Sequence, residues 1–364
     1  MKTVEYENLA AVNTMYFDKL TSAFDSVLRK GWYILGAQVK EFEKNFAEYL
    51  GVKHCIGVAS GLDALILSLR AFDFAQGDEV IVPSNTYIAT ILSIMHCGLK
   101  PVLVEPDIRT YNIDPAKIEA AITPRTKAIM IVHLYGKACN MAPVMAVKEK
   151  YGLKLIEDCA QSHGALFNKQ ITGTFGEFGA FSFYPTKNLG ALGDAGAVVT
   201  NDDDLALAIR RLRNYGSDVK YYNEVVGYNS RLDEMQAAFL NAKLPSLNEY
   251  NAYKRRLASM YLNKLSANFI LPVIEEDFFD VFHVFTVRTK ERDRLRSYLL
   301  ENGIKTDVHY PVPPHKQKAM QGILDGADFP ISEEIHRTIV SLPLSFGHKA
   351  EEIEYVIEVM NKFE

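Results

Sequence analysis

The sequence predicts an α/β protein in which helices cover both faces of a mostly parallel sheet, with a smaller α+β domain following it. Three observations support this fold class. Short apolar runs alternate with segments of helical spacing as far as Asp202, and the pattern changes beyond that residue. The chain has 364 residues, of which 48% are apolar, and this is enough for two hydrophobic cores. We therefore expect a large domain over residues 1–245 and a small domain over residues 246–364.

The predicted strands of the large domain are apolar throughout, as is typical of parallel strands buried on both faces. They cover residues 80–82, 101–104, 128–132, 153–156 and 197–200. Helical spacing between them predicts helices over residues 86–96, 114–122 and 143–151, with Gly98, Pro124 and Gly152 shortly after their ends. Such crossovers place ligands beyond the carboxyl ends of the strands. Asp158 and Gln161 follow the 153–156 strand and so lie at the predicted mouth of a site.

The second half of the chain has a different pattern. Residues 205–215 have helical spacing, residues 216–227 form a polar loop that contains tyrosines, and residues 232–265 predict a long helix kinked at Pro245. Beyond this helix, we expect strands over 281–288 and 305–310 and a helix over 291–302. The small domain is therefore predicted to be α+β.

Charge and composition exclude several classes of function. The net charge of -5 comes from 40 basic and 45 acidic residues without long blocks of one sign, so we expect no nucleic acid or membrane partner. No apolar signal core begins the chain and no run of about 18 apolar residues follows, which favours a cytoplasmic protein. The four cysteines are far apart, without the spacing of metal ligands. We expect reduced core thiols and no metal.

Lys187 is the most informative residue. It follows an apolar strand-like segment and precedes Gly190, Gly193 and Gly196. A lysine forms a Schiff base only when its amine is unprotonated, and burial lowers the lysine pKa toward that state. Most lysines are solvated surface groups, but these glycines favour close approach of the backbone to a ligand. We interpret Lys187 as an amine in a cleft suited to a phosphorylated aldehyde.

For a phosphorylated aldehyde built on a pyridine ring, Asp158 is suited to pair with the ring nitrogen. A carboxylate beside the ring nitrogen keeps that nitrogen protonated and makes the ring an electron sink. The alternative for Asp158 is a helix N-cap. Gln161 suits a hydrogen bond to the phenolic oxygen of the ring, and we expect His163 to orient Asp158 from behind. Ordinary structural roles are the alternatives for both residues.

Phosphate recognition is predicted at Ser60 and Gly61, which directly precede an amphipathic run. A helix start offers free backbone N–H groups to an anion, and Gly61 permits close approach. An ordinary helix cap is the alternative. Ser182 is the expected second phosphate contact. Tyr87 begins the helix after the next strand and suits stacking on the pyridine ring, with a core aromatic as the alternative.

Together, these segments resemble the fold type I pyridoxal-phosphate enzymes and, within them, the DegT/DnrJ/EryC1/StrS family of sugar aminotransferases. The resemblance covers nearly the whole chain. Its motifs are Gly-Trp-Tyr-Ile-Leu-Gly at 31–36, Ser-Gly-Leu-Asp-Ala-Leu at 60–65, Glu-Asp-Cys-Ala-Gln-Ser-His at 157–163, the lysine segment at 179–196, and the segments at 227–238 and 308–311.

The resemblance implies pyridoxal 5'-phosphate as the cofactor. Lys187 would be the Schiff-base lysine and proton shuttle, Asp158 the partner of the pyridinium nitrogen, Gln161 the contact to the ring hydroxyl, and Tyr87 the stacking ring.

The family also implies a phosphate cradle and a dimer. Ser182 with Ser60, Gly61 and Leu62 would hold the cofactor phosphate. Many relatives have threonine where this chain has Leu62, but the backbone amide remains, so we expect the cofactor to bind. In the implied homodimer, Asn229 reaches the phosphate of the opposite subunit.

The substrate is suggested by the segment Phe-Tyr-Pro-Thr-Lys-Asn-Leu-Gly-Ala-Leu-Gly-Asp at 183–194. It resembles the subgroup that aminates carbon three of dTDP-linked 3-keto-6-deoxyhexoses. Enzymes that act at carbon four more often carry Lys-x-Ile-Thr-x-Gly-Glu-Gly, with glutamate roughly where Asp194 stands. The family implies L-glutamate as the amino donor and ping-pong kinetics. Candidate substrate contacts, from their place in loops near the expected cleft, are Tyr184, Tyr221, His309 and Tyr310, with packing roles as the alternative.

Other functions remain as alternatives. They are a 4-aminotransferase of the same family, a related pyridoxamine-dependent sugar dehydratase, and a catalytically silent protein that binds sugar nucleotides. The dehydratases have histidine in place of the lysine, whereas this chain keeps Lys187. Retention of Lys187, Asp158 and Gln161 together favours an active aminotransferase over a silent scaffold.

Overall fold

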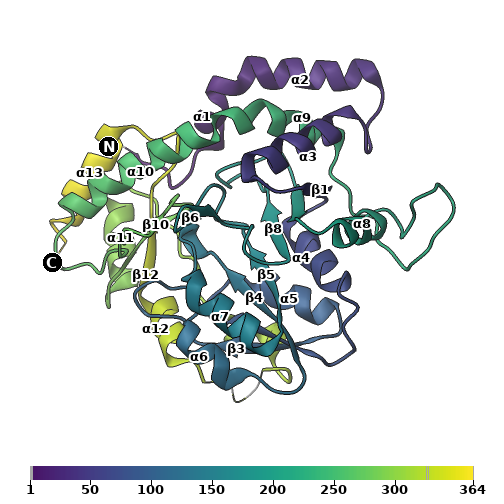
Figure 1. Ribbon diagram of the computed structural model, residues 1–364. Coiled ribbons are helices and arrows are strands. Elements are labelled where there is room, and N and C mark those ends of the chain that lie inside the picture. Colours follow the sequence, from purple (N-terminus) through teal and green to yellow (C-terminus); the bar gives the residue numbers. More distant parts are fainter. Residues whose placement is uncertain (1–2, 325, 327, 364) are drawn as a thin grey trace.

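A seven-stranded sheet forms the centre of the larger part of the molecule in this computed structural model, which describes residues 3–324, 326 and 328–363 (Figure 1). The strand order is β1-β9-β8-β5-β4-β2-β3. The strands are β1 His54–Val58, β2 Glu79–Pro83, β3 Lys100–Val104, β4 Thr126–Val132, β5 Lys154–Asp158, β8 Phe178–Ser182 and β9 Gly196–Thr200. The pairs from β8 to β3 are parallel, whereas β9 is antiparallel to both β8 and β1. The mostly parallel sheet confirms the predicted fold class.

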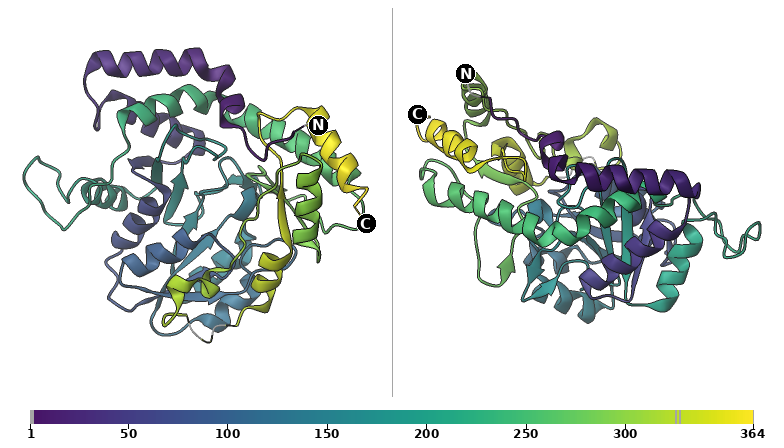
Figure 2. Two further views of the ribbon diagram at one scale, coloured as in Figure 1. Left: turned by 180° about the vertical axis from the view of Figure 1, so that it is seen from behind. Right: turned by 90° about the horizontal axis from the view of Figure 1, so that it is seen from above.

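Helices cover both faces of this sheet (Figures 1 and 2). Met130 of β4 enters a core with α4, α5 and α8, whereas its neighbours Ile129 and Ile131 enter a core with α6 and α7 on the other face, where α3 and α9 also pack. This alternation follows from the two-residue period of a strand. The helices of this part are α1 Leu9–Asn13, α2 Phe17–Lys30, α3 Ala37–Leu50, α4 Gly61–Arg70, α5 Ile88–His96, α6 Pro115–Ile118, α7 Met141–Tyr151, α8 Asp203–Leu212 and α9 Glu234–Lys243.

Short 3-10 turns mark the places where the regular pattern breaks. The predicted 114–122 helix is split into α6 and the turn Glu119–Ala121. Pro245 lies in the turn Leu244–Ser246, which separates α9 from α10 Leu247–Lys264, so the predicted break is confirmed. Further 3-10 turns cover Thr14–Tyr16, Leu134–Gly136, Pro314–Lys316 and Lys318–Met320.

A separate core lies toward the C-terminus. It joins α10, α11 Arg292–Glu301, α13 Ala350–Met360 and the antiparallel pair β11 Phe285–Arg288 and β12 Ile339–Leu342, and it includes Val4 from the N-terminal end. Helix α12 Pro330–Thr338 precedes β12, and the small strands β6 Leu166–Phe167, β7 Gln170–Ile171 and β10 Phe278–Phe279 form a three-stranded sheet. The boundary at residue 245 stays a prediction.

Two sequence expectations in this region need correction. The 305–310 segment is not a strand, because Asp307 makes only an isolated bridge to Ser341. The His309 carbonyl and the Tyr310 hydroxyl of this segment instead accept hydrogen bonds from Tyr135 and Gln161. The strand expected over 281–288 is limited to Phe285–Arg288. The residues before it lie against Gly136, whose carbonyl accepts the Val281 N–H at 2.9 Å.

Two smaller expectations, buried free cysteines and a loop over residues 216–227, are met. Cys55, Cys97, Cys139 and Cys159 are all buried and free. Residues 216–227 form a loop that projects from the body beyond α8 (Figures 1 and 2). Among the described helices, none has the combined length and apolar character that a membrane crossing requires.

Candidate active site

The candidate site lies where β5 and β8 end side by side. Asp158 is the last residue of β5 and Ser182 is the last residue of β8, and the two strands pair in parallel. Lys187 follows β8 after a short loop in which its backbone N–H donates to the Tyr184 carbonyl at 2.8 Å. This is the strand-end location that the sequence predicts.

Lys187 has an unusually acidic ammonium group. Burial lowers its pKa to about 8, and the negative charge of Asp158 opposes this shift. Part of the Lys187 surface is still exposed, so the amine is enclosed by protein yet reachable. At neutral pH the lowered pKa brings the amine closer to the unprotonated form that attacks a carbonyl.

A buried polar network holds the Lys187 loop. The Asn188 side-chain amide donates to Asn251 Oδ1 at 2.8 Å and to the Val281 carbonyl at 3.0 Å, and Lys254 Nζ donates to Asn188 Oδ1 at 3.2 Å. Lys243 Nζ donates to the Gly190 carbonyl at 2.8 Å. Sequence reasoning missed these residues. Helical spacing alone does not tell which polar residues of α9 and α10 face inward.

Asp158 is buried and accepts two hydrogen bonds from the described protein. Thr90 Oγ1 donates to Oδ2 at 3.0 Å, and the Ala160 N–H donates to Oδ1 at 3.1 Å. Burial nevertheless raises the pKa of Asp158 above its usual value, against the opposing effects of these donors and of Lys187. Thr90 was not predicted, although a hydroxyl in the apolar helix Ile88–His96 is a signal that could have marked it.

The expectation that His163 orients Asp158 is wrong. His163 is fully buried beside Phe181 and Phe183, with ring centroids 5.5 and 5.6 Å away, and neither of its ring nitrogens has a hydrogen-bond partner in the described chain. Burial lowers its pKa to about 3. The histidine is therefore a neutral core residue, because its side chain packs among aromatic rings and does not reach the carboxylate.

The residues predicted to bind phosphate lie together at the start of α4. Ser60 is the N-cap, its Oγ accepting the Asp63 N–H at 3.1 Å. A Cβ on Gly61 would lie 2.6 Å from Ser182 Cβ, and one on Gly196 would lie 2.3 Å from the Ser60 carbonyl oxygen. Glycine at both positions therefore lets the helix start approach β8 and β9. The N–H groups of the first turn, including Gly61 and Leu62, lie beside the Ser182 hydroxyl without intrahelical acceptors.

Gln161 connects the two parts of the molecule. Its Oε1 accepts the Tyr135 N–H at 2.7 Å, and its Nε2 donates to the Tyr310 hydroxyl at 2.9 Å. The Tyr310 ring lies 5.2 Å from the ring of Tyr87, which is 53% exposed and so available for stacking. His309 Nδ1 shares a hydrogen bond with Ser341 Oγ at 2.8 Å, and burial lowers the His309 pKa. The structure thus brings Tyr87, Gln161, His309 and Tyr310 together.

Three predicted residues are less closely tied to this cluster. Tyr184 is 52% exposed in the Lys187 loop. Tyr221 is 84% exposed on the projecting 216–227 loop, and Asn229 is also exposed. Within the described part of the chain, neither Tyr221 nor Asn229 hydrogen-bonds a predicted site residue.

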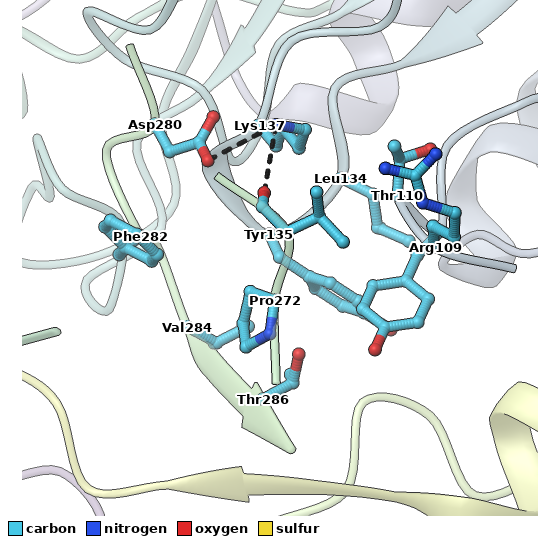
Figure 3. Close-up of a pocket in the computed structure, with 12 residues that line it drawn as sticks. Arg109, Thr110, Leu134, Tyr135, Lys137, Pro272, Asp280, Phe282, Val284 and Thr286 are labelled. Atoms are coloured by element: carbon cyan, nitrogen blue, oxygen red, sulfur yellow. Dashed lines mark hydrogen bonds and ion pairs between the residues drawn. The ribbon is translucent and has the colours of Figure 1, made fainter. Parts of the chain in front are cut away.

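A pocket drawn in Figure 3 is separate from this site. It lies between segments around Arg109, Tyr135 and Phe282. Lys137 in its wall pairs with Glu275 at 3.1 Å and with Asp280 at 3.5 Å. Lys137 and Asp280 therefore neutralise each other in its wall, and neither Lys187 nor Asp158 lines this pocket.

The residues at the strand ends fit pyridoxal phosphate. Asp158 is a buried carboxylate whose raised pKa indicates too little positive charge around it, which a protonated ring nitrogen would supply. The lowered pKa of Lys187 suits an imine-forming amine. The start of α4 and Ser182 provide N–H and hydroxyl donors for a phosphate.

Comparisons with known proteins agree with this geometry. The model of the DegT/DnrJ/EryC1/StrS aminotransferase family matches residues 17–361. A dTDP-3-amino-3,6-dideoxy-alpha-D-galactopyranose transaminase of Aneurinibacillus thermoaerophilus is 54% identical over 361 residues, which is 99% of each chain.

Two solved structures are also similar. DesV of S. venezuelae, in complex with a ketimine intermediate, has a TM-score of 0.97 and 43% identity over 100% of this chain and 98% of its own. NtdA of Bacillus subtilis, with bound cofactor PMP, has a TM-score of 0.93 and 31% identity over 99% of this chain and 85% of its own. The chain therefore belongs to the DegT/DnrJ/EryC1/StrS aminotransferase family.

Proposed function

We propose that this aminotransferase moves an amino group from L-glutamate to carbon three of a dTDP-linked 3-keto-6-deoxyhexose. The amine of Lys187, with its pKa lowered to about 8 beside buried Asp158, is the observation that supports amino transfer. The sugar and the carbon atom are supported by the 183–194 segment and by the relative that is named as a 3-amino-3,6-dideoxygalactose transaminase.

Pyridoxal phosphate, when bound, supplies an electron sink for the carbon that loses its proton. Lys187 would hold the cofactor and, once displaced by the amino donor, carry that proton from one carbon to the other. Asp158 would keep the ring nitrogen protonated. Ser60, Gly61, Leu62 and Ser182 would bind the phosphate.

The remaining site residues orient the two reactants. Tyr87 would cover one face of the cofactor ring, and Gln161 would donate to the ring hydroxyl. Tyr184, Tyr221, His309 and Tyr310 are the proposed contacts to the nucleotide sugar. Because the same residues serve both halves of the reaction, ping-pong kinetics are expected.

We also propose a homodimer in which Asn229 completes the partner's site. Helix α2 packs on α9 on one side and leaves large apolar side chains exposed on the other. Phe17, Phe24, Leu28, Trp32 and Tyr33 are between 46% and 66% exposed. An exposed apolar surface of this kind is typical of an interface, and a second copy is the occupant that Asn229 requires. Light scattering of the purified holoenzyme would test the dimer.

One incubation tests the reaction itself. The purified protein is given L-glutamate and a panel of 3-keto and 4-keto hexoses linked to dTDP or UDP, and the aminated carbon is identified by mass spectrometry and NMR. We expect amination at carbon three of the dTDP-linked 3-keto-6-deoxyhexose. Amination only at carbon four would contradict the carbon assignment, and faster turnover of UDP sugars would contradict the nucleotide. A colourless protein without turnover would support the silent binding protein.

A further inference from the structure

A closed ring of hydrogen bonds passes through Tyr135. Its backbone N–H donates to Gln161 Oε1 at 2.7 Å, and Gln161 Nε2 donates to the Tyr310 hydroxyl at 2.9 Å. The Tyr135 hydroxyl donates to the carbonyl of His309, the residue that precedes Tyr310. The ring therefore ties the 307–310 segment of the small domain to the ends of β4 and β5.

The backbone of Tyr135 is held in the left-handed region by a neighbouring side chain. Tyr135 has φ 60° and ψ 7°, in the left-handed region that favours glycine. Asn112 holds the segment in this form, accepting the Leu134 N–H at 2.9 Å and donating to the Lys137 carbonyl at 3.0 Å. Glycine would adopt this conformation without strain, but glycine would lack the hydroxyl that donates to the His309 carbonyl.

The ring also determines which way the Gln161 amide faces. The Tyr135 N–H is a donor, so it requires the oxygen of the amide, and Nε2 must then face the site. Nε2 donates to the Tyr310 hydroxyl, which accepts this bond and keeps its own proton for another acceptor. Tyr310 thus becomes a hydrogen-bond donor of fixed orientation at the mouth of the site.

We propose that Tyr135 is a positioning residue for the sugar half of the reaction. It orients the Gln161 amide through its N–H and holds His309 and Tyr310 against the large domain through its hydroxyl. The inference rests on the proposed function for its substrate, because His309 and Tyr310 are the proposed contacts to the sugar. The tie between the two segments is independent of the substrate's identity.

Tyr135→Phe removes the hydroxyl and keeps the backbone N–H. The matched control is Tyr111→Phe, a neighbouring buried tyrosine whose ring centroid is 5.9 Å away and which makes no hydrogen bond to Gln161, His309 or Tyr310. Hydrogen exchange of the holoenzyme should become faster in residues 305–312 for Tyr135→Phe and stay at the wild-type rate for Tyr111→Phe. Equal exchange in the two variants would overturn the proposal.

Kinetics of the two half-reactions give the second readout. We expect kcat/KM for the keto-sugar to fall about tenfold in Tyr135→Phe, as for the loss of one hydrogen bond, while the glutamate half-reaction keeps its wild-type rate. Equal losses in both half-reactions would indicate a general structural role and overturn the proposal. If the wild-type enzyme aminates none of the sugars, the proposed function fails, and the exchange measurement still decides the role of Tyr135.

Tyr310→Phe opens the ring from its other side. If the ring acts as a unit, the loss in the Tyr135→Phe/Tyr310→Phe double variant is smaller than the product of the two single losses. Losses that multiply would overturn the proposal. Tyr310→Phe should also raise exchange in residues 305–312, which keeps the test decisive even if Tyr135→Phe does not fold.

Discussion

Two neighbouring carboxylates on β5 have opposite surroundings. Glu157 is fully buried and accepts hydrogen bonds from His133 Nε2 at 2.9 Å and from three backbone N–H groups. Those N–H groups belong to Gly173, Phe175 and Gly176, at 2.7, 2.7 and 2.8 Å. Asp158, the next residue, points to the other face of the sheet and has two donors in the described chain, Thr90 and Ala160.

This difference is the one expected between a structural carboxylate and a carboxylate that binds a ligand. The donors around Glu157 compensate its charge within the protein. His133 Nδ1 accepts the Cys139 N–H at 2.9 Å, so its Nε2 carries the proton that Glu157 accepts. His133 and Glu157 therefore bind each other, although with Cys159 they resemble a set of metal ligands. Burial raises the pKa of Asp158, and the surrounding groups do not fully compensate its charge, which is typical of a ligand site.

The largest expected effect comes from replacing Lys187. Lys187→Ala is expected to fold, to lose the visible absorbance of the bound cofactor and to lose turnover by about 10⁴-fold, because the amine that would form the imine and carry the proton is removed. Lys243 and Lys254 provide the control, since their pKa values are also lowered to about 8 but their amines bind carbonyl groups inside the protein. Borohydride reduction and peptide mapping should label Lys187, and a label on either other lysine would refute the assignment.

Asp158→Asn should separate activity from stability. Turnover is expected to fall about 10²-fold or more because the neutral amide does not hold the ring nitrogen protonated. The pKa of Asp158 is raised in the folded protein, so its contribution to stability is present at low pH and is lost as the pH rises through that pKa. At neutral pH, the cofactor-free variant should therefore be at least as stable as the wild type. Urea denaturation measures this, and a clear destabilisation would argue against the comparison.

Glu157→Gln should have the reverse effect. The new amide nitrogen would face groups that are hydrogen-bond donors themselves, so donor would meet donor. We therefore expect a loss of about 3 kcal/mol in the free energy of unfolding. The folded fraction should keep its kcat, because Glu157 faces away from Lys187. A large drop in kcat without a loss of stability would show that Glu157 also takes part in the reaction.

The smallest predicted effect concerns His163. Its pKa of about 3 lies below the unfolded value of 6.5, so the unfolded chain binds more protons between these pH values and stability falls as the pH falls through this range. His163→Phe should weaken this fall by up to about 1.4 kcal/mol per pH unit. The pKa values of His283 and His336 are also lowered by burial, so part of the pH dependence of stability should remain in the variant. Thermal unfolding of both proteins between neutral and mildly acidic pH measures the difference.

The parts of the site that sequence reasoning located are those with a local signature. Lys187 has an apolar strand before it and glycines after it, Ser60 and Gly61 begin a helix, and Asp158 ends a strand. The sequence did not reveal residues whose contacts lie far away along the chain. The alternation of 305–310 resembles a strand, but its backbone pairs with β12 only at Asp307, and His309 and Tyr310 instead hydrogen-bond Tyr135 and Gln161.

The sequence by itself determined the fold class and marked Lys187, Ser60 and Gly61 as candidate site residues, because strand period, helix caps and glycine positions act over a few neighbouring residues. Only the tertiary structure decided which buried carboxylate is satisfied, that His163 packs among phenylalanines, and that Thr90, Lys254 and Tyr135 support the site. These facts depend on which side chains from remote segments face each other, and that is set by the packing of the whole chain and not by any local pattern.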